Sequence, residues 1–502
     1  MKSLSRSALP ELAGNPALQL PAEGQFTLPE KILQFGTGVL LRGLPDFFVE
    51  QANRAGKFNG RIVVVKSTDG GDADAFTRQD NLYTLCIKGV KEGRIVEENL
   101  VCSAISRVLI AKTQWNEILA CAVSPDLQAV VSNTTEVGIQ LVEESIDQAP
   151  PSSFPAKLLA MLKARYDAFA GAADKGLVIV PTELIPDNGT KLKNILLELA
   201  RINGLSPEFV RWMESANTFC NSLVDRIVPG HPGSEAAAKL EQELGYKDDL
   251  LAVSEVYRLW AIEGGEKVKK VLSFREVDPG VIIEPDISVY RELKLRLLNA
   301  THTLSCGFAH LCGFDTVKEA MADPAMNAFI RHLMLEEIAP AIPHPVDLEK
   351  ARAFGREVVD RFANPFLDHH WLSITLQYSS KMLMRVMPVL IRYYENFGKA
   401  PEAISLGFAA WLRFIQPAEA ADGAYYGSFN GVRYRINDDK AEHIYKRLQG
   451  VPPNKIPESL LSDQMIWKED LTRLHGFVEK VAFYYTAITD GSAKALLSKF
   501  GH

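Results

Sequence analysis

The feature that most restricts the fold of this chain is a short apolar strand that runs directly into a glycine turn. Residues 31–35 have the composition of a buried strand, and Gly36-Thr-Gly38 follows without a break. A helical pattern then begins near Leu40 and continues past Phe48. Because a strand, a tight turn and a helix in this order begin a βαβ unit, we expect a parallel sheet.

Later segments repeat the strand signature. Three further runs are rich in β-branched residues, which is typical of parallel strands covered on both faces. They lie at residues 61–65, 127–132 and 176–180, and helical patterns lie between them at 113–121 and 156–170. Strands that alternate with helices predict a doubly wound, Rossmann-type α/β domain.

The character of the sequence changes after about residue 285, where long helical patterns begin to dominate. They cover residues 289–312, 316–338, 347–362, 371–395, 401–414, 439–449 and 467–500. An exception is Asn430-Gly431, which predicts a β-hairpin because this pair accommodates the positive φ angles of a tight turn. We expect an N-terminal arm (1–30), a Rossmann-type domain (31–285) and a mostly α-helical domain (286–502).

Composition argues against several kinds of partner. The 502 residues carry a formal net charge of −7, which disfavours nucleic acid or an anionic membrane as the main partner. No apolar run reaches the roughly 18 residues of a membrane span, and no apolar segment of a secretory signal follows Lys2 and Arg6. The six cysteines show no zinc-type spacing, which is typical of reduced thiols in a cytoplasmic protein.

The glycine turn is half of a dinucleotide-binding fingerprint. Gly36 and Gly38 allow the backbone to turn tightly and to approach a pyrophosphate, which then lies against a helix N-terminus. The usual third glycine is replaced by Leu41, and the next glycine is Gly43. The turn alone therefore leaves two interpretations open, a nucleotide site and a merely tight turn.

The end of the second strand normally selects between NAD and NADP, because an acidic residue there accepts the ribose 2′-hydroxyl of NAD. This chain has Lys66-Ser67-Thr68 at that place, with Asp69 slightly later. Lys66 would tolerate a 2′-phosphate or would lie in solvent. These residues leave the cofactor preference open.

A second polar set lies in the predicted helix 289–312. Lys294, Asn299 and His302 place an amine, a carboxamide and an imidazole at i, i+5 and i+8. In an α-helix their side chains fall within an arc of about 140°. They would suit proton transfer from an alcohol and stabilisation of the resulting oxyanion. The alternative is an ordinary charged helix face without a catalytic role.

Together these motifs resemble the polyol-specific long-chain dehydrogenases, the mannitol dehydrogenase family. The Lys-x4-Asn-x2-His signature of that family is matched at Lys294, Asn299 and His302. The resemblance covers about residues 30–490. It implies a metal-free enzyme with a Rossmann-type domain, a helical C-terminal domain and the three matched residues as its catalytic set.

The resemblance also implies a cofactor site. The GxGxxxR loop of the family is matched at Gly36, Gly38 and Arg42. We therefore expect NAD as the hydride carrier. The cofactor contacts that the resemblance implies are Phe35, Gly36, Thr37, Gly38, Val39, Leu40, Arg42, Thr68, Asn133, Thr134, Thr135 and Glu136.

Further blocks of the family indicate the substrate. The implied contacts are Asn188, Asp225, Arg226, Lys381 and Arg385. The blocks at 34–38, 79–84 and 361–385 are typical of a branch that acts on hexuronates. Mannitol-type members carry an arginine and a histidine where this chain has Ser373 and Leu376, which disfavours a simple polyol.

The expected reaction moves a hydride between nicotinamide and the keto carbon of a hexuronate. Lys294 would be the general acid/base, neutral in oxidation and charged in reduction. The family glutamate three residues before it is Arg291 here, which places a proton path through that position in doubt. Lys381 and Arg385, at i and i+4, would clamp the substrate carboxylate unless they are simply solvated.

Several alternatives stay open. The adjacent His369 and His370 point in different directions on a helix and lack an accompanying HExxH motif, so we expect no metal. The substrate would be a hexuronate or aldonate, and the residues do not distinguish its configuration or exclude a mannitol-type polyol. A nucleotide-binding protein without catalysis is the alternative from a different class. We expect a monomer or a small homo-oligomer.

Overall fold

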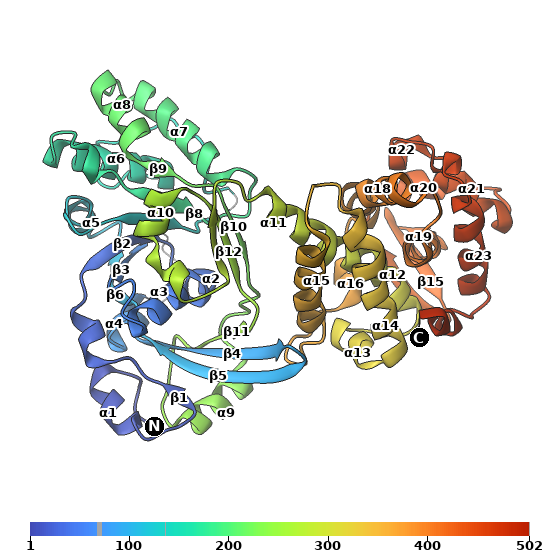
Figure 1. Cartoon of the computed structure of the whole chain (residues 1–502), viewed down its shortest axis with the longest axis horizontal. Helices are drawn as coiled ribbons and strands as arrows, with labels where there is room; N and C mark the ends of the chain where they lie inside the picture. The colour runs from blue at the N-terminus through green and yellow to red at the C-terminus, as the bar shows by residue number, and fades with distance from the viewer. Residues whose placement is uncertain (68–72, 136, 501–502) are drawn as a thin grey trace. The chain divides into compact units, whose positions relative to one another are not determined.

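The computed structural model describes residues 1–67, 73–135 and 137–500, which divide into two compact units. One unit comprises Met1–Gly89 and Ile95–Ile287, and the other comprises Val90–Arg94 and Ser288–His502. The first contains a parallel sheet and the second consists mainly of helices (Figure 1). The predicted fold class, a Rossmann-type α/β domain followed by a helical domain, is confirmed.

Within the described residues, the central sheet of the N-terminal unit has six strands, and each neighbouring pair is parallel. Their order is β6 (Ile105–Ile110), β3 (Arg61–Lys66), β2 (Glu30–Phe35), β7 (Ala129–Ser132), β8 (Val178–Pro181) and β9 (Thr218–Phe219). The chain starts at β2 and winds outward in both directions, so the order reverses between β2 and β7. Such a switch point leaves a crevice at the carboxyl ends of the strands.

Both faces of this sheet are covered, which explains why its strands have nearly continuous apolar sequences. Ile32 of β2 belongs to a buried cluster that includes α3 (Pro45–Arg54), whereas Leu33 belongs to a cluster that includes α6 (Phe154–Ala168). Side chains that alternate in this way bury both sides of the strand. Figure 1 shows the two helices on opposite sides of the sheet.

The first thirty residues, expected as an arm, pack on the N-terminal unit through short elements. β1 (Leu18–Gln19) pairs with β5 (Arg94–Cys102) in a second, four-stranded sheet. Leu4 and Leu9 are buried in one apolar cluster with Tyr246. This cluster fixes the segment to the body of the unit.

In the C-terminal unit the predicted helix 289–312 is continuous but not uniform. It begins as α11 (Ser288–Leu293), widens into a π-helical stretch, η5 (Lys294–Ala300), and ends as α12 (Thr301–Leu311). A π-helical turn closes between residues i and i+5 and is a rare feature that often marks functional sites. None of the helices in the described ranges combines the length and the apolar character that a membrane span needs.

Two further π-helical stretches have a visible cause in the sequence. They are η6 (Leu333–Ile338) and η8 (Met382–Val386), and Pro340 and Pro388 follow them. Proline has no N–H for the carbonyl four residues earlier, and its ring pushes that carbonyl aside. The helix therefore widens before each proline.

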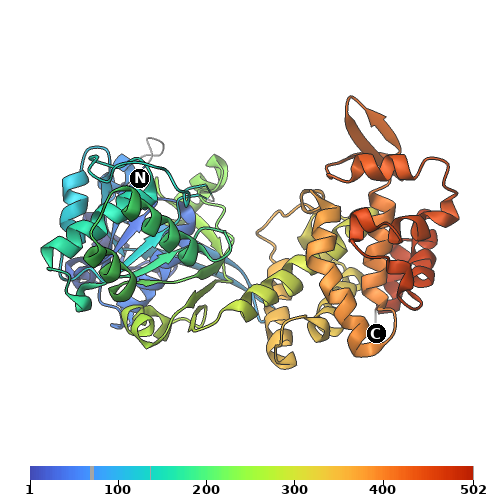
Figure 2. The ribbon, with the colours of Figure 1, turned by 90° about the horizontal axis from the view of Figure 1, so that it is seen from above.

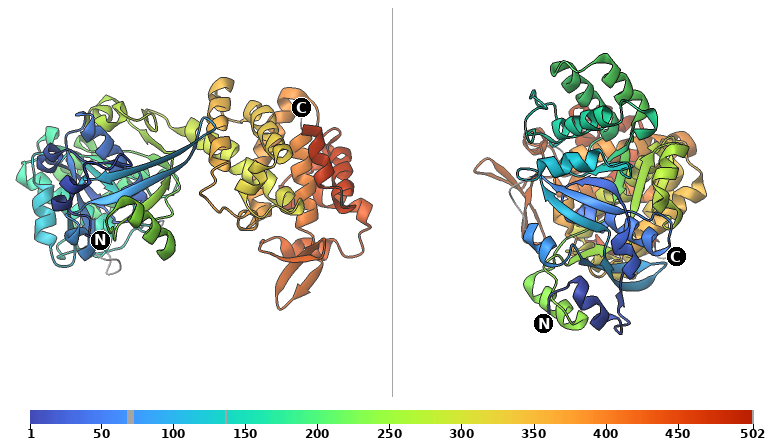
Figure 3. Two further views of the ribbon diagram at one scale, coloured as in Figure 1. Left: turned by 90° about the horizontal axis from the view of Figure 1, so that it is seen from below. Right: turned by 90° about the vertical axis from the view of Figure 1, so that its left-hand side faces the viewer.

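The hairpin prediction is confirmed. β15 (Ala424–Phe429) and β16 (Val432–Ile436) pair in antiparallel fashion around Asn430 and Gly431, whose φ angles are 49° and 80°. With β14 (Glu419–Ala421) they form a small sheet. Figures 2 and 3 show this sheet projecting from the helices of its own unit.

A buried carboxyl group lies under the first turn of α3. Asp46 Oδ2 accepts a hydrogen bond from Gln34 Nε2 at 3.4 Å, while Oδ1 has no hydrogen-bond partner among the described residues. Burial raises the pKa of Asp46 from 3.8 to about 8, against the opposing effects of Gln34 and of the Arg42 charge. The folded state therefore favours the protonated acid.

We predict that Asp46→Asn stabilises the protein more at pH 8 than at pH 5. The folded state retains a proton that the unfolded state releases above pH 3.8, so the unfolding free energy of the wild type falls as pH rises toward about 8. The slope is at most about 1.4 kcal/mol per pH unit. Urea unfolding at both pH values measures the effect, with the exposed Asp249→Asn as control. Equal stabilisation at both pH values would contradict the prediction.

Candidate functional site

The carboxyl end of β2 turns through a glycine that no other residue fits without strain. Gly36 has φ +127°, and a Cβ at this position would lie 2.9 Å from the carbonyl oxygen of Asn133 and 2.9 Å from Leu41 Cδ1. The Gly36 N–H donates to the Val65 carbonyl at 3.1 Å, and the Asn133 N–H donates to the Phe35 carbonyl at 3.1 Å. The turns after β2 and β7 are therefore packed together at the switch point of the sheet.

Gly38 differs from Gly36 because it faces open space. A Cβ there would meet no atom within 4 Å, and its φ of −62° is ordinary. Gly38 precedes the short helix α2 (Val39–Gly43). The surface of the turn is thus free for a ligand to approach closely, as the glycine motif predicts.

Arg42 turns away from this surface. Its side chain is buried, donates to the Leu250 carbonyl and lies over the ring of Tyr83, whose hydroxyl donates to the Arg42 carbonyl at 2.8 Å. In this structure Arg42 Nη1 is bound to a backbone carbonyl inside the N-terminal unit, and the predicted contact of Arg42 with the cofactor stays a prediction.

The other predicted cofactor residues lie around the same switch point or outside the described residues. Phe35 is buried at the end of β2; Thr37, Val39 and Leu40 are half-buried; Thr135 is exposed. Thr68 and Glu136 lie outside the residues that the structure describes.

The loop after β7 rests on a carboxylate that the sequence did not single out. Glu183 Oε1 accepts from the Thr134 N–H at 2.9 Å and from the Thr134 hydroxyl at 3.0 Å, and Oε2 accepts from the Ser132 hydroxyl at 3.1 Å. Asn133 Nδ2 donates to the Thr182 carbonyl at 3.1 Å. Burial raises the pKa of Glu183, although these donors act against the shift. Glu183 is a positioning group for the predicted cofactor loop.

Asn188 begins α7 (Asn188–Ile202) with its amide already bound to the backbone. Nδ2 donates to the carbonyls of Pro181, Glu183 and Ser222 at 3.0–3.1 Å. Oδ1 accepts from the N–H groups of Gly189 and Ser222 at 2.9 Å. An amide has two donors and two lone pairs, so the Asn188 amide is fully hydrogen-bonded in this structure, and its predicted substrate contact stays a prediction.

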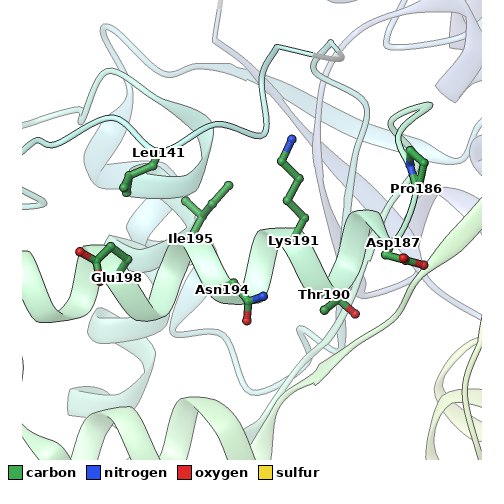
Figure 4. A pocket seen from close by; sticks show the side chains of 8 residues that line it. All are labelled: Leu141, Pro186, Asp187, Thr190, Lys191, Asn194, Ile195 and Glu198. Carbon is green, nitrogen blue, oxygen red and sulfur yellow. The ribbon is translucent and has the colours of Figure 1, made fainter.

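A cavity of about 370 Å³ lies on the outer face of α7. Figure 4 shows Ile195 and Lys191 directed from the helix toward the segment that carries Leu141. The lining residues are Leu141, Pro186, Asp187, Thr190, Lys191, Asn194, Ile195 and Glu198. None of them is a predicted site residue.

Arg226, the predicted further cation for the substrate, is an internal residue of the N-terminal unit. Nε donates to the Glu255 carbonyl at 2.9 Å, Nη1 donates to the Gly43 carbonyl at 2.5 Å, and the guanidinium lies 4.6 Å from the centre of the Phe47 ring. Asp225 ends β10 (Ser222–Asp225) and is buried as well. Two of its nitrogens thus hold backbone carbonyls of the unit, and the predicted role of Arg226 toward the substrate stays a prediction.

In the C-terminal unit, Lys294 and Asn299 share the π-helical turn η5. Since such a turn closes between i and i+5, their side chains stand one turn apart on the same face. With α-helical periodicity the predicted angle about the helix axis between these two side chains is larger. In the π-helical turn the amine and the carboxamide therefore point in more similar directions than the sequence predicted.

His302 lies in an aromatic and cationic environment. Its ring stacks on Phe362 with centroids 3.9 Å apart and planes 5° apart, and His369 lies edge-on at 5.2 Å. Nε2 is buried without a hydrogen-bond partner among the described residues. Burial, followed by the charges of His369, Arg361, Arg385 and Lys381, holds the pKa of His302 well below its ordinary value. The imidazole is therefore neutral at physiological pH.

Lys381 and Arg385 belong to the same cluster. Lys381 Nζ donates to the Ile374 carbonyl at 2.9 Å, and Arg385 Nη1 donates to the Thr303 hydroxyl at 3.3 Å. Thr303 in turn donates to the Asn299 carbonyl at 2.8 Å. Burial lowers the pKa of both cations, and the Arg385 charge lowers that of Lys381 further.

The structure thus brings His302, Lys381 and Arg385 together and links them through Thr303 to the turn that carries Lys294 and Asn299. Sequence reasoning missed Thr303 and Phe362. Thr303 lies four residues after Asn299, a spacing that marks one helix face. The stacking of Phe362 had no local signal, because it depends on a contact between distant segments.

Among the residues that the structure describes, no group of three or more His, Cys, Asp or Glu is placed to hold an ion. The absence of a metal stays a prediction.

The sequence itself matches two family models. The Mannitol dehydrogenase Rossmann domain matches residues 30–275, and the Mannitol dehydrogenase C-terminal domain matches residues 286–489.

Similar proteins match over nearly their full length. The altronate oxidoreductase of Halalkalibacterium halodurans is 38% identical over 481 residues, which cover 94% of this chain and 93% of that protein. The altronate oxidoreductase of Bacillus subtilis is 37% identical over 472 residues, which cover 93% of this chain and 95% of that protein. The altronate oxidoreductase of Yersinia enterocolitica is 36% identical over 481 residues, which cover 94% of this chain and 97% of that protein.

Solved structures share the fold. D-sorbitol dehydrogenase in substrate-free form gives a TM-score of 0.78 at 23% identity and covers 98% of this chain and 100% of its own. Pseudomonas fluorescens mannitol 2-dehydrogenase, in a ternary complex with NAD and D-mannitol, gives 0.64 at 24% identity and covers 99% of both chains.

We predict that alanine has different effects at the two glycines of the turn. Gly36→Ala should destabilise the protein by about 1–3 kcal/mol, because the backbone is left-handed and Asn133 blocks the Cβ. Gly38→Ala should leave stability unchanged and weaken NADH binding, because its Cβ projects into the space where a pyrophosphate would lie. Urea unfolding and NADH fluorescence titration measure the two effects. Tight NADH binding by Gly38→Ala would exclude the turn as the pyrophosphate site.

Proposed function

The chain belongs to the mannitol dehydrogenase family, and on that premise we propose that it interconverts D-tagaturonate and D-altronate with NAD as its cofactor. It is a nicotinamide-dependent dehydrogenase that acts on CH–OH groups. The altronate oxidoreductases that it resembles are matched over 93–97% of their length, which supports the specific reaction. The observation that carries the proposal is the cluster of His302, Lys381 and Arg385 beside the turn of Lys294 and Asn299.

The N-terminal unit fits a dinucleotide. The open surface at Gly38 and the reversal of strand order between β2 and β7 are the features that a pyrophosphate needs. Asn133 and Thr134, held by Thr182 and Glu183, would line the same crevice. When bound, NAD supplies or accepts the hydride.

The C-terminal unit supplies the proton chemistry. In reduction, the Lys294 ammonium gives its proton to the substrate oxygen as that oxygen gains charge, and in oxidation the neutral amine takes the proton back. The Asn299 amide and the neutral His302 imidazole donate to the same oxygen. Each such donor is worth about 3 kcal/mol in comparable oxyanion sites.

The cations of the cluster fit the carboxylate of a sugar acid. Lys381 and Arg385 are half-buried, and the partial desolvation of their charges is unfavourable. A substrate carboxylate would offset that cost and accept charge-assisted hydrogen bonds from both. A neutral polyol would not, which favours a hexuronate over mannitol.

Fructuronate reduction is the alternative within the family, because it offers the same carboxylate and keto group in another configuration. A nucleotide-binding protein without catalysis is the alternative from another class. The buried and unpartnered Nε2 of His302 argues against it, because an unsatisfied buried polar atom is costly unless a ligand uses it.

We predict that the protein oxidises NADH with tagaturonate faster than with fructuronate or fructose, and that Lys294→Ala lowers kcat by about 10²- to 10⁴-fold. NADH affinity should be unchanged, because the loss affects proton transfer only. Stopped-flow absorbance of NADH and fluorescence titration measure the two quantities. The exposed Lys446→Ala is the control. Near-normal turnover of Lys294→Ala would exclude Lys294 as the acid/base, and no turnover of any substrate by the wild type would refute the proposed function.

We predict that Arg385→Met raises the KM for tagaturonate much more than the KM for fructose, which lacks the carboxylate. The loss of a hydrogen bond to a charged group costs about 1.5–3 kcal/mol, which corresponds to a roughly 10- to 150-fold change in KM. Initial rates with both substrates measure the change. Equal increases for the two substrates would exclude Arg385 from carboxylate binding.

A further inference from the structure

One buried arginine connects two of the three π-helical stretches. Arg296, in η5, donates from Nη1 to the carbonyls of Met384 and Arg385 in η8, both at 2.8 Å. Its Nε and Nη2 donate to the Glu292 carboxylate at 2.9 and 3.3 Å. Four hydrogen bonds and a compensating carboxylate thus hold the guanidinium in one orientation.

One of the two carbonyls needs this donor because of the proline that follows it. Pro388 lies four residues after Met384 and has no N–H to offer to the Met384 carbonyl. A carbonyl that is partly shielded from water and lacks a donor is unfavourable. Arg296 satisfies it from the neighbouring helix, and its second contact fixes the next carbonyl along the chain.

The segments that Arg296 joins are the two that carry the proposed chemistry. η5 contains Lys294 and Asn299, and η8 contains Arg385 and begins directly after Lys381. We propose that Arg296 is a positioning residue that holds the carboxylate-binding segment in register with the acid/base segment, and so sets the preference of the enzyme for substrates with a carboxylate. This inference rests on the proposed function.

A second contact shows why register matters. Arg385 reaches the Thr303 hydroxyl at 3.3 Å, and Thr303 is bound to the Asn299 carbonyl at 2.8 Å. A shift of the η8 backbone would move the Arg385 side chain away from this chain of contacts. Lysine cannot replace Arg296, because a single ammonium group lacks the planar fork that reaches two carbonyls and a carboxylate at once.

The test is the ratio of kcat/KM for tagaturonate to kcat/KM for fructose. This ratio does not depend on the fraction of folded enzyme, so a merely structural defect leaves it unchanged. In Arg296→Lys the ratio should fall about tenfold. Arg352→Lys, which alters an ion pair with Glu336 in the same unit, should leave the ratio unchanged. An unchanged ratio in Arg296→Lys would overturn the proposal.

Non-additivity gives a second test. In an Arg385→Met background, Arg296→Lys should lower the ratio much less than tenfold, because Arg385, the cation of η8 that it positions, is already absent. An additional tenfold fall would show that Arg296 acts by another route. If Arg296→Lys fails to fold, Glu292→Gln, which removes the charge that orients the guanidinium, should lower the ratio in the same direction; no change would overturn the proposal.

A third measurement needs no turnover and separates this inference from the proposed function. Amide hydrogen exchange in Arg296→Lys should accelerate in residues 382–387 and remain as in the wild type in β2 and β3. Protected amides at 382–387 would refute the positioning role even in an active enzyme. A different result would be faster exchange in η8 of the variant while the wild type reduces none of the substrates. That result would refute the proposed function but would still support the structural contact of Arg296 between η5 and η8.

Discussion

The candidate site of the C-terminal unit depends on a carbonyl group that a proline leaves without its helical donor. Pro388 widens the preceding turn, and Arg296 supplies the missing hydrogen bond from another helix. Glu292 compensates the buried charge of Arg296. A local defect in one helix is thereby converted into a fixed connection between two helices, and the polar residues of both acquire defined positions.

In the N-terminal unit, other groups fix the backbone turns around the candidate cofactor site. The close approach of Gly36 to Asn133 leaves no room for a side chain, and Glu183 satisfies the backbone and hydroxyl donors of the loop that follows β7. Arg42 Nη1 and Asn188 Nδ2, which belong to family motifs, donate to backbone carbonyls inside the unit. Residues of these motifs therefore also hold the backbone around the candidate site in place.

Features with a local cause could be predicted from the sequence. The β-branched runs, the glycine turn and the Asn430-Gly431 hairpin each follow from nearby residues, and the structure has all of them. The inward direction of Arg42 could not be predicted, because its partner Leu250 is about two hundred residues away. The π-helical turn at Lys294 was missed because the periodicity argument assumed 3.6 residues per turn. Pro388, inside the predicted helix 371–395, was a visible signal of the widened turn η8.

Two separate effects lower the pKa of His302, and both bear on the proposed reaction. Positive charges near His302 oppose its protonation, and burial opposes it more strongly. In the proposed reaction, a substrate carboxylate at Lys381 and Arg385 would offset the charge effect and leave burial, the larger cause, in place. A neutral imidazole could donate one hydrogen bond without competing with Lys294 for the transferred proton. The separation of roles between a neutral donor and a proton-transferring amine would thus follow from burial of the His302 ring.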